Sequence, residues 1–438
     1  MIDTNIFSSR KALFHTFGCK LNFAETSTVA AIMADHGILR AQPGEVPDII
    51  VVNTCSVTEL ADKKCRQTIR SLHKRYPQAP ILVTGCYAQL KPDEVASIDG
   101  VAVVAGVNQK LLLNQYLESW LNDCRTQVDV PDAKSLREFM PSCSRGDRTR
   151  FFLKVQDGCD NWCTYCTIPK ARGRSRSGDI DMLVGQAREA ALAGGKEIVI
   201  TGVNIGDFGK GTDKTFFDLI RRLDEVEGIE RFRISSIEPD LLTDEIISWC
   251  AASRAFMPHF HVPLQSGSDE VLRLMHRHYD TALFRDKMLM IRSAIPDAFI
   301  GVDLIVGARG ETQERFEESR GFVDSLPISR LHVFPYSERP GTRALSIDGA
   351  VSPQEKRRRD HVMLRLSDAK QRAFTSAFTG TVRPVLLEHP EPGGMMSGFT
   401  DNYLRVSVKA ETAPANTIVN VRLDEFNPET MQITGEIV

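Results

Sequence analysis

Three cysteines in the segment GCDNWCTYC, residues 158 to 166, have a spacing that indicates metal chemistry. Cys159, Cys163 and Cys166 follow a C-x₃-C-x₂-C pattern, and no fourth cysteine or histidine lies close behind them. A structural zinc site takes four ligands, and the bacterial ferredoxin run is C-x₂-C-x₂-C-x₃-C-P, so neither pattern fits. A zinc loop completed by a distant ligand is the alternative. A cubane iron–sulfur cluster held by only three thiolates would keep one iron free for a small molecule.

A second set of three cysteines is spread over the first hundred residues. Cys19 closes TFGC, Cys55 closes NTC and Cys86 closes TGC, each just after a predicted strand. In an open parallel sheet the strand ends meet at one edge, where such sheets bind ligands, so the three cysteines can converge in space. The alternative is that they are ordinary buried residues. The remaining candidates show no such placement and are predicted to be non-ligands: Cys65, Cys124, Cys143 and Cys250.

The elements that must position these cysteines divide into three predicted domains. Residues 1–125 alternate strand and helix, which predicts an α/β domain with a parallel sheet, and polar residues 126–150 are predicted to be a linker. Residues 151–375 hold six strand candidates, each followed by a loop and a helix, which predicts an incomplete (β/α)₆ barrel. The loop with Cys159, Cys163 and Cys166 then lies on the face where barrel active sites are built. Residues 376–438 contain short strands separated by Gly, Pro, Asn and Asp, typical of a small all-β barrel that binds oligonucleotides.

Composition sets wider bounds on the 438-residue chain. Apolar residues make up 42% and charged residues 25%, which is ordinary for a globular protein, and no apolar run is long enough for a membrane span. The N-terminus does not resemble a secretory signal, so we expect a cytoplasmic location, where ten cysteines are unlikely to form a disulfide framework. The net charge of −3 requires any nucleic-acid contact to come from local basic patches.

The cysteine loop resembles that of the radical S-adenosylmethionine (SAM) superfamily, with Tyr165 as the aromatic residue before the last cysteine. In that superfamily the methionine end of SAM chelates the open iron. Polar residues at the ends of the next strands would then contact the cofactor, although singly each could be a turn or helix-cap residue. The candidate SAM contacts are Tyr165, Gly202, Asn204, Ser235, Glu238 and Gln265.

Longer motifs resemble the methylthiotransferase family of radical SAM enzymes over essentially the whole chain. They include TFGCKLN, VNTCSVTELADKK, VTGCYAQ, ITGVNIGDFG, HVPLQSGSDEVLRLMHRHY and GFTDNYLRV. The resemblance implies two [4Fe-4S] clusters, an auxiliary one on Cys19, Cys55 and Cys86 and the SAM cluster on Cys159, Cys163 and Cys166, and a C-terminal TRAM domain for RNA. A 5′-deoxyadenosyl radical would activate C2 of an adenine, and a second SAM would methylate a sulfur held at the auxiliary cluster.

GCKLN at the first cysteine is similar to the branch that converts N6-threonylcarbamoyladenosine (t6A) at position 37 of tRNA into its 2-methylthio form. The isopentenyladenosine branch, which typically has GCQMN, is the alternative substrate class, and a non-catalytic metal-containing RNA-binding protein is the alternative of another class. One departure from the family is GARGE at residues 307–311, where many relatives have GFPGE, and it weakens any carry-over of backbone contacts at this strand end.

Binding of tRNA requires phosphate contacts and a pocket for one extruded base. The basic candidates are Lys170, Arg172, Arg174 and Arg176 beside the cysteine loop, and Arg383 and Arg405 in the C-terminal barrel. The run from Lys356 to Arg359 is predicted to be mainly a solvated helix face, and His259 and His261 are predicted to be packed rather than catalytic. An electron donor such as flavodoxin or ferredoxin is the expected protein partner.

Overall fold

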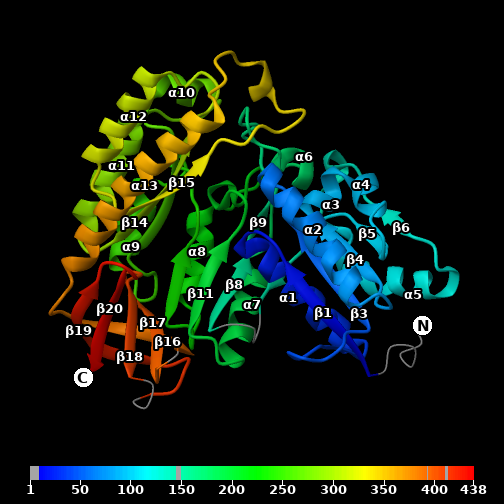
Figure 1. The fold of residues 1–438 in the computed structure, drawn as a ribbon. Coiled ribbons are helices and arrows are strands. Elements are labelled where there is room, and N and C mark those ends of the chain that lie inside the picture. Colours follow the sequence, from blue (N-terminus) through cyan, green and yellow to red (C-terminus); the bar gives the residue numbers. More distant parts are fainter. Residues whose placement is uncertain (1–8, 145–148, 392, 410–412) are drawn as a thin grey trace.

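The computed structural model describes residues 9–144, 149–391, 393–409 and 413–438 of the chain. It confirms the predicted fold class: a parallel-sheet α/β domain, an incomplete barrel and a small closed β barrel follow one another along the chain (Figure 1). The first two parts lie side by side, and the C-terminal barrel lies beneath the central one in this view.

The N-terminal domain is built on a six-stranded parallel sheet of order β2-β1-β3-β4-β5-β6. Its central strands are runs of buried β-branched and aliphatic residues, which suit a sheet covered on both faces. The strands are β1 Arg10–Thr16, β2 Ile38–Arg40, β3 Ile49–Thr54, β4 Ile81–Gly85, β5 Val101–Ala105 and β6 Gln127–Asp129. The helices are α1 Lys20–Asp35, α2 Glu59–Arg75, α3 Cys86–Leu90, α4 Pro92–Ala96 and α5 Leu113–Asp123, with a 3₁₀ turn at Gln109–Leu112.

The central domain contains all six predicted strands. They form two parallel groups, β8-β11-β12 and β13-β14-β15, joined by single bridges such as that from Ser236 to His261. The strands are β8 Arg150–Lys154, β11 Glu197–Thr201, β12 Arg231–Ile234, β13 His259–Gln265, β14 Phe299–Val306 and β15 Arg330–Pro335. The helices are α6 Ile168–Arg172, α7 Ile180–Leu192, α8 Phe216–Asp224, α9 Asp244–Ala252, α10 Asp269–Leu274, α11 Thr281–Ala294, α12 Gln313–Ser325 and α13 Pro353–Ser376. Short pieces complete it: an antiparallel pair, β9 Gln156–Asp157 with β10 Arg176–Ser177, and 3₁₀ turns at Ala133–Ser135, Ile205–Asp207 and Arg343–Ser346.

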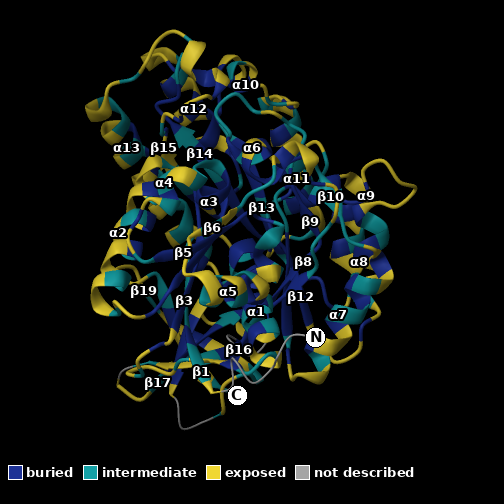
Figure 2. Cartoon of the chain, turned by 90° about the vertical axis from the view of Figure 1, so that its right-hand side faces the viewer, coloured by how far each residue is buried: buried dark blue, intermediate teal, exposed yellow. Residues whose placement is uncertain are grey.

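Alternation along the barrel strands separates an apolar outer face from a polar inner face. On β13 the residues Phe260, Val262 and Leu264 join the hydrophobic core beneath the helices, so His259 and His261 face the interior. The same rule places Asp303 of β14 inside, because Val302 and Leu304 belong to that core. Buried strands under half-exposed helices are visible in Figure 2. The barrel interior is therefore lined largely by ionisable side chains.

The C-terminal domain is a closed barrel of order β16-β17-β18-β20-β19. Four of its strands were expected from the sequence, but β17, which begins just after two glycines, was not. The strands are β16 Val382–Glu391, β17 Met395–Thr400, β18 Arg405–Lys409, β19 Ile418–Asn427 and β20 Gln432–Ile437. Arg231 and Arg233 of β12 dock this barrel, since their guanidinium groups donate to the carbonyls of Phe399, Thr400 and Asp401.

Residues 126–150 are not the bare linker that the sequence predicts. Gln127–Asp129 forms β6 and extends the N-terminal sheet, and Ser142–Cys143 forms β7, antiparallel to β8. Edge strands of two or three residues carry too little hydrophobic pattern to be recognised in the sequence.

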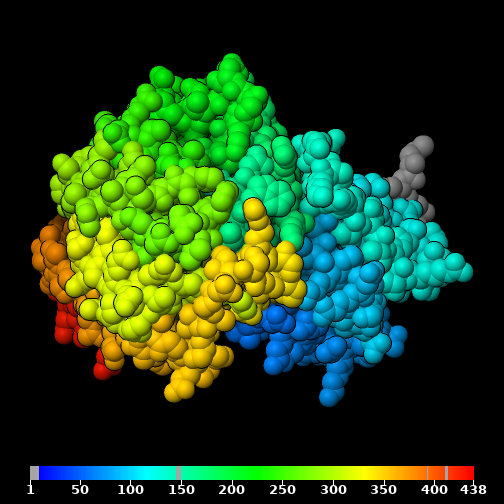
Figure 3. Space-filling model, turned by 90° about the horizontal axis from the view of Figure 1, so that it is seen from above, coloured from blue at the N-terminus to red at the C-terminus, as the bar shows by residue number. Residues whose placement is uncertain are grey.

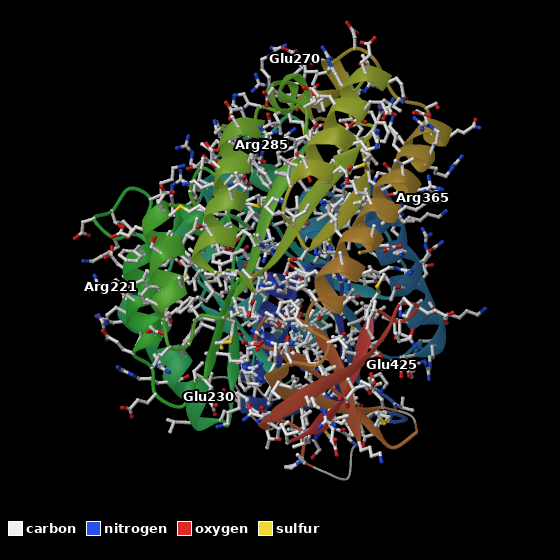
Figure 4. The ribbon with its side chains drawn as sticks, turned by 90° about the vertical axis from the view of Figure 1, so that its left-hand side faces the viewer. Arg221, Glu230, Glu270, Arg285, Arg365 and Glu425 are labelled. Atoms are coloured by element: carbon white, nitrogen blue, oxygen red, sulfur yellow. The ribbon has the colours of Figure 1, made fainter. Side chains whose placement is uncertain are left out.

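The segment after β15 bridges the two larger domains, as Figure 3 shows in yellow and orange. Arg339 in this segment donates to the Ser56 hydroxyl at 2.6 Å and pairs with Asp62 at 3.0 Å. Charged side chains such as Arg221, Glu270 and Arg365 lie on the outside of the helices (Figure 4). Among the described residues, no helix has both the length and the apolar content that a membrane crossing requires.

Candidate metal and cofactor site

The structure brings Cys19, Cys55 and Cys86 together at one edge of the N-terminal sheet. They follow β1, β3 and β4, which are neighbouring strands. Gly18 has φ +94°, and a Cβ there would lie 2.8 Å from the Cys55 Cβ, so only glycine allows this approach. The pKa of Cys55 is raised to about 12, mainly by burial and further by the neighbouring Cys86 and Cys19 thiols. Three thiols held this closely fit a metal cluster, which would stabilise their thiolate forms.

A buried charged cluster joins this cysteine edge to the barrel. Arg172 of α6 donates to Glu25 at 3.0 Å, to Asp157 at 2.9 Å and to Asn22 at 2.7 Å. Glu25 also accepts from Lys154 at 2.9 Å and pairs with Lys110. The pKa of Glu25 lies well below its usual range because the surrounding cations outweigh the effect of burial.

Arg172 also acts on the auxiliary cysteines. Burial raises the pKa of Cys86, and the Arg172 guanidinium beside its thiol opposes that rise. Arg172 is only 1% exposed, so a phosphate cannot reach it, and the prediction that it contacts RNA is excluded by its position. The partners Glu25, Lys110 and Asp157 carry no sequence signal of their own, because only the packing of α1 against the barrel brings them together.

The loop that carries Cys159, Cys163 and Cys166 is held between α6 and the end of α10. The backbone of Cys159 donates to the Gly173 carbonyl at 3.1 Å, and that of Thr164 donates to the Met275 carbonyl at 3.1 Å. Gly158 has φ +71°, and a Cβ there would meet the Arg174 carbonyl at 2.0 Å, so the turn into the loop requires glycine. The pKa of Cys166 is raised to about 12, mainly by burial and next by the neighbouring Cys163 thiol.

Arg277 is a site residue that the sequence reasoning missed. Its Nη1 donates to the Cys163 Sγ at 3.1 Å, and its Nη2 pairs with Glu238. Burial raises the pKa of Glu238 to about 7, although Arg277 opposes the rise. The structure therefore connects the predicted cofactor residue Glu238 to the cysteine loop. The signal was present in the quoted stretch MHRHY, but nothing in it singles out the arginine.

Two predicted SAM contacts, Gly202 and Asn204, directly follow β11. Asn204 is 3% exposed, and neither its amide oxygen nor its amide nitrogen has a partner among the described residues. Its backbone N–H donates to Gln156 Oε1 at 2.8 Å, and Gly202 packs against the same glutamine. An unsatisfied buried amide needs a polar ligand, which fits the charged methionine end of SAM.

The other predicted cofactor residues have more varied surroundings. Ser235 is buried just after β12, and Gln265 lies at a register shift of β13 with φ +68°. A side chain held in this conformation at a strand end is common at binding sites. Tyr165 packs against the same small hydrophobic cluster as Ile305, and burial raises its pKa well above the usual value. Its observed contacts are those of a packing residue next to the cysteines.

The departure GARGE is accommodated locally. Ala308 is buried in the cluster against which Tyr165 packs, and Arg309 reaches outward to pair with Glu338 at 2.8 Å. Arg359 pairs with Glu311 at 2.7 Å, so this member of the basic run faces inward. A cavity of about 760 Å³ opens beside the cysteine loop, between Asp160 and the segment that follows Asn204.

The basic candidates differ in what holds them. Arg176 donates to Asp157 and to Asn108, both at 3.1 Å, and Arg383 is engaged by Asp401 and Asp297. Both are therefore structural in this arrangement and are poor phosphate contacts. Three candidates are exposed: Lys170, which donates to the Gly341 carbonyl, Arg174, and Arg405, which pairs with Glu391 at 2.6 Å.

Comparisons with known proteins agree with this division of the chain. Residues 11–106 match the model of the uncharacterised protein family UPF0004, and residues 153–323 match that of the radical SAM superfamily. The chain is 38% identical over 420 residues to "Threonylcarbamoyladenosine tRNA methylthiotransferase MtaB" of Bacillus subtilis, with 94% of this chain and 93% of the relative covered. The protein of the same name from Thermotoga maritima is 35% identical, with 89% of each chain covered.

A relative of lower identity and a solved structure also match the chain. A "tRNA-2-methylthio-N(6)-dimethylallyladenosine synthase" of Acetivibrio thermocellus is 29% identical, with 98% of this chain and 92% of the relative covered. Among solved structures, the radical S-adenosylmethionine methyltransferase TsrM from Kitasatospora setae aligns with a TM-score of 0.56 and 14% identity, covering 77% of this chain and 74% of that one. This last likeness concerns the fold alone.

Proposed function

Because the chain belongs to the methylthiotransferase family of radical SAM enzymes, we propose that it transfers a methylthio group to C2 of t6A at position 37 of tRNA. The relatives of 31–38% identity carry the threonylcarbamoyladenosine name, whereas those named for dimethylallyladenosine are 27–29% identical. The product is the 2-methylthio form, and the enzyme uses SAM and [4Fe-4S] clusters.

The observation that carries the proposal is the meeting of two three-cysteine sets at one domain junction. Arg172 lies six positions after Cys166 and reaches the Cys86 thiol, so the two sets border the same region. The residues present fit two clusters, each held by three thiolates and each with an iron left open. When bound, these clusters supply reductive cleavage of SAM to a carbon radical and a sulfur for methylation and transfer.

The chain's own residues would bind, orient and exclude water. Arg277 would fix the Cys163 sulfur and compensate its negative charge, and Glu238 holds Arg277 in place. Asn204 and Gly202 would receive the polar end of SAM. The Gln156 side chain holds this turn, because its Oε1 accepts from the backbone N–H groups of Val203 and Asn204. Arg172 would compensate the charge at Cys86 while it ties α1 to the barrel.

The substrate is tRNA, and its contacts are part of the proposal. Lys170 and Arg174 flank the cysteine loop on exposed positions, and Arg405 is exposed on the C-terminal barrel, so phosphates on either side of the modified base can be bound at both places. The reductant would be a flavodoxin or ferredoxin in the cytoplasm.

The test uses the full chain, reconstituted anaerobically with iron and sulfide, with SAM, a chemical reductant and tRNA that carries t6A. We expect 5′-deoxyadenosine and 2-methylthio-t6A by mass spectrometry of the digested nucleosides. A triple variant C159A/C163A/C166A serves as the control without SAM cleavage. Product from isopentenyladenosine tRNA and none from t6A tRNA would refute the substrate assignment, and the absence of 5′-deoxyadenosine would refute the radical chemistry.

A further inference from the structure

Lys20, directly after Cys19, is a half-buried cation without a counterion. It lies within electrostatic range of Arg150, Arg233 and Glu197. Both carboxylates of this region already have an arginine, since Glu388 pairs with Arg150 at 2.6 Å and Glu197 pairs with Arg233 at 2.9 Å. No hydrogen bond or ion pair joins the Lys20 Nζ to another residue in the described part of the chain. A cation shielded from water in this way calls for an anionic ligand.

The Lys20 side chain reaches the polar interior of the barrel. Its charge is one of the groups that lower the pKa of His259 and of His332, after the larger effect of burial. Tyr403 of the C-terminal barrel closes the same region, and its pKa is lowered despite burial because Arg150 and Lys20 lie beside it. The Tyr403 ring lies 4.4 Å from the His259 ring, centroid to centroid, so side chains of all three domains meet around the ammonium, although the Lys20 backbone follows the auxiliary Cys19.

Three further polar side chains face the same interior of the barrel. Asp303 Oδ1 accepts from the Nε2–H of His261 at 2.8 Å, and His332 is the register partner of Asp303 on β15. One ligand atom from each of the three lies within 4.8 Å of the others. The Oδ2 of Asp303 has no hydrogen-bond partner among the described residues, and its side chain is 22% exposed. The barrel interior thus offers the Asp303 Oδ2 as an acceptor beside the imidazoles of His261 and His332.

The spacing of inward residues along β14 suits the length of the substituent on the modified base. Ile305, which packs against the same cluster as Tyr165, is two residues beyond Asp303 on β14. Inward residues two apart on a strand are separated by about 6.6 Å. The threonylcarbamoyl group is about two residues long, which is about 7 Å when extended. In adenine, C2 and the carbon that carries N6 both flank N1, so with C2 at the level of the cysteines the N6 substituent starts beside it and is long enough to span one such spacing toward Asp303 and Lys20.

We propose that Lys20, Asp303 and His332 form the binding site of the threonylcarbamoyl group, with the Lys20 ammonium paired to its carboxylate. Asp303 accepts from the urea N–H or the threonyl hydroxyl, and His332 borders the same group. An isopentenyl group would leave the Lys20 ammonium and the Asp303 carboxylate without partners in a partly dehydrated interior, so the site also rejects the alternative substrate. This inference rests on the proposed function and assigns its substrate selectivity to named residues.

The test compares two RNAs that differ only in one charge. One is an anticodon stem–loop carrying t6A, and the other is the same RNA with the threonyl carboxylate converted to its methyl ester. We expect the reconstituted holoenzyme to bind the acid about 30-fold or more tightly than the ester. In K20Q this ratio should fall to near one, and in K20R it should largely return. K74Q, which removes an exposed lysine of α2, is the matched control and should keep the wild-type ratio.

Two measurements separate recognition from damage. Iron content and the electron paramagnetic resonance spectrum of the reduced clusters should be unchanged in K20Q, and if they are not, the acid-to-ester ratio of the wild type still decides. D303N should weaken acid and ester by the same factor, because Asp303 contacts the uncharged part. Equal binding of acid and ester by the wild type, or an unchanged ratio in K20Q, would overturn the role of Lys20. Stoichiometric Zn²⁺ binding that D303N abolishes would overturn the direct contact at Asp303.

The outcome can also be told apart from failure of the proposed function. Preference for the acid without any 2-methylthio product would retain the binding site and refute the reaction. Product formed with equal kcat/KM from acid and ester would retain the reaction and refute the role of Lys20.

Discussion

Replacing Glu25 by Gln tests whether the buried charged cluster holds the N-terminal domain against the barrel. Glu25 is 1% exposed and accepts from Lys110, Lys154 and Arg172, which are themselves 1–2% exposed. E25Q keeps the shape but leaves Asp157 as the single carboxylate for four buried cations, Arg176 being the fourth. Removing one partner of a buried ion cluster costs about 3–5 kcal/mol, because the remaining charges stay shielded from water.

The assay is hydrogen exchange of the anaerobic holoenzyme, read on peptides from α1 and β8, together with urea unfolding of the whole chain. We expect faster exchange at this junction and a lower unfolding midpoint in E25Q. E317Q, which removes an exposed glutamate paired with Arg320 at 2.8 Å, is the matched control and should behave as the wild type. Exchange in E25Q indistinguishable from that of E317Q would show that packing, and not charge, holds the junction.

Three other predictions follow from the same geometry. Replacing Cys19, Cys55 and Cys86 by Ala should spare some 5′-deoxyadenosine formation but abolish methylthio transfer, whereas C159A/C163A/C166A should lose both; equal loss of SAM cleavage would contradict this division. Gly18→Ala should lose about half of the iron, that of the auxiliary cluster, because its Cβ would lie 2.8 Å from the Cys55 Cβ; full iron content would count against the close approach. The pKa values of Glu25 and Asp157 are depressed by neighbouring cations despite burial, so their contribution to stability is present above about pH 4 and is lost as the pH falls below it; an acid unfolding curve of E25Q as steep as that of the wild type would refute this.

Motif spacing and strand periodicity carried most of the fold and the cysteine assignments. Five of the six barrel strands are largely buried runs whose pattern depends only on neighbouring residues, so they could be predicted, whereas β6 and β7 exist because a longer strand offers an edge to pair with. The RNA candidates show the limit most clearly. Lys170, Arg172, Arg174 and Arg176 alternate along one short stretch, yet the structure leaves the first and third exposed and turns the second and fourth toward Asp157.

The sequence by itself determined both cysteine sets: one lies in a single loop after one strand, and the other follows three parallel strands, whose carboxyl ends meet at one edge whatever surrounds them. Only the tertiary structure decided which charges compensate those thiols and which face the substrate. Arg277 reaches Cys163 from a position 114 residues away, and Arg172 meets Glu25 across 147 residues. The unpaired state of Lys20 likewise depends on arginines from other strands claiming both nearby carboxylates. Electrostatic partners are set by distance in space, which a linear chain does not record until its domains have packed.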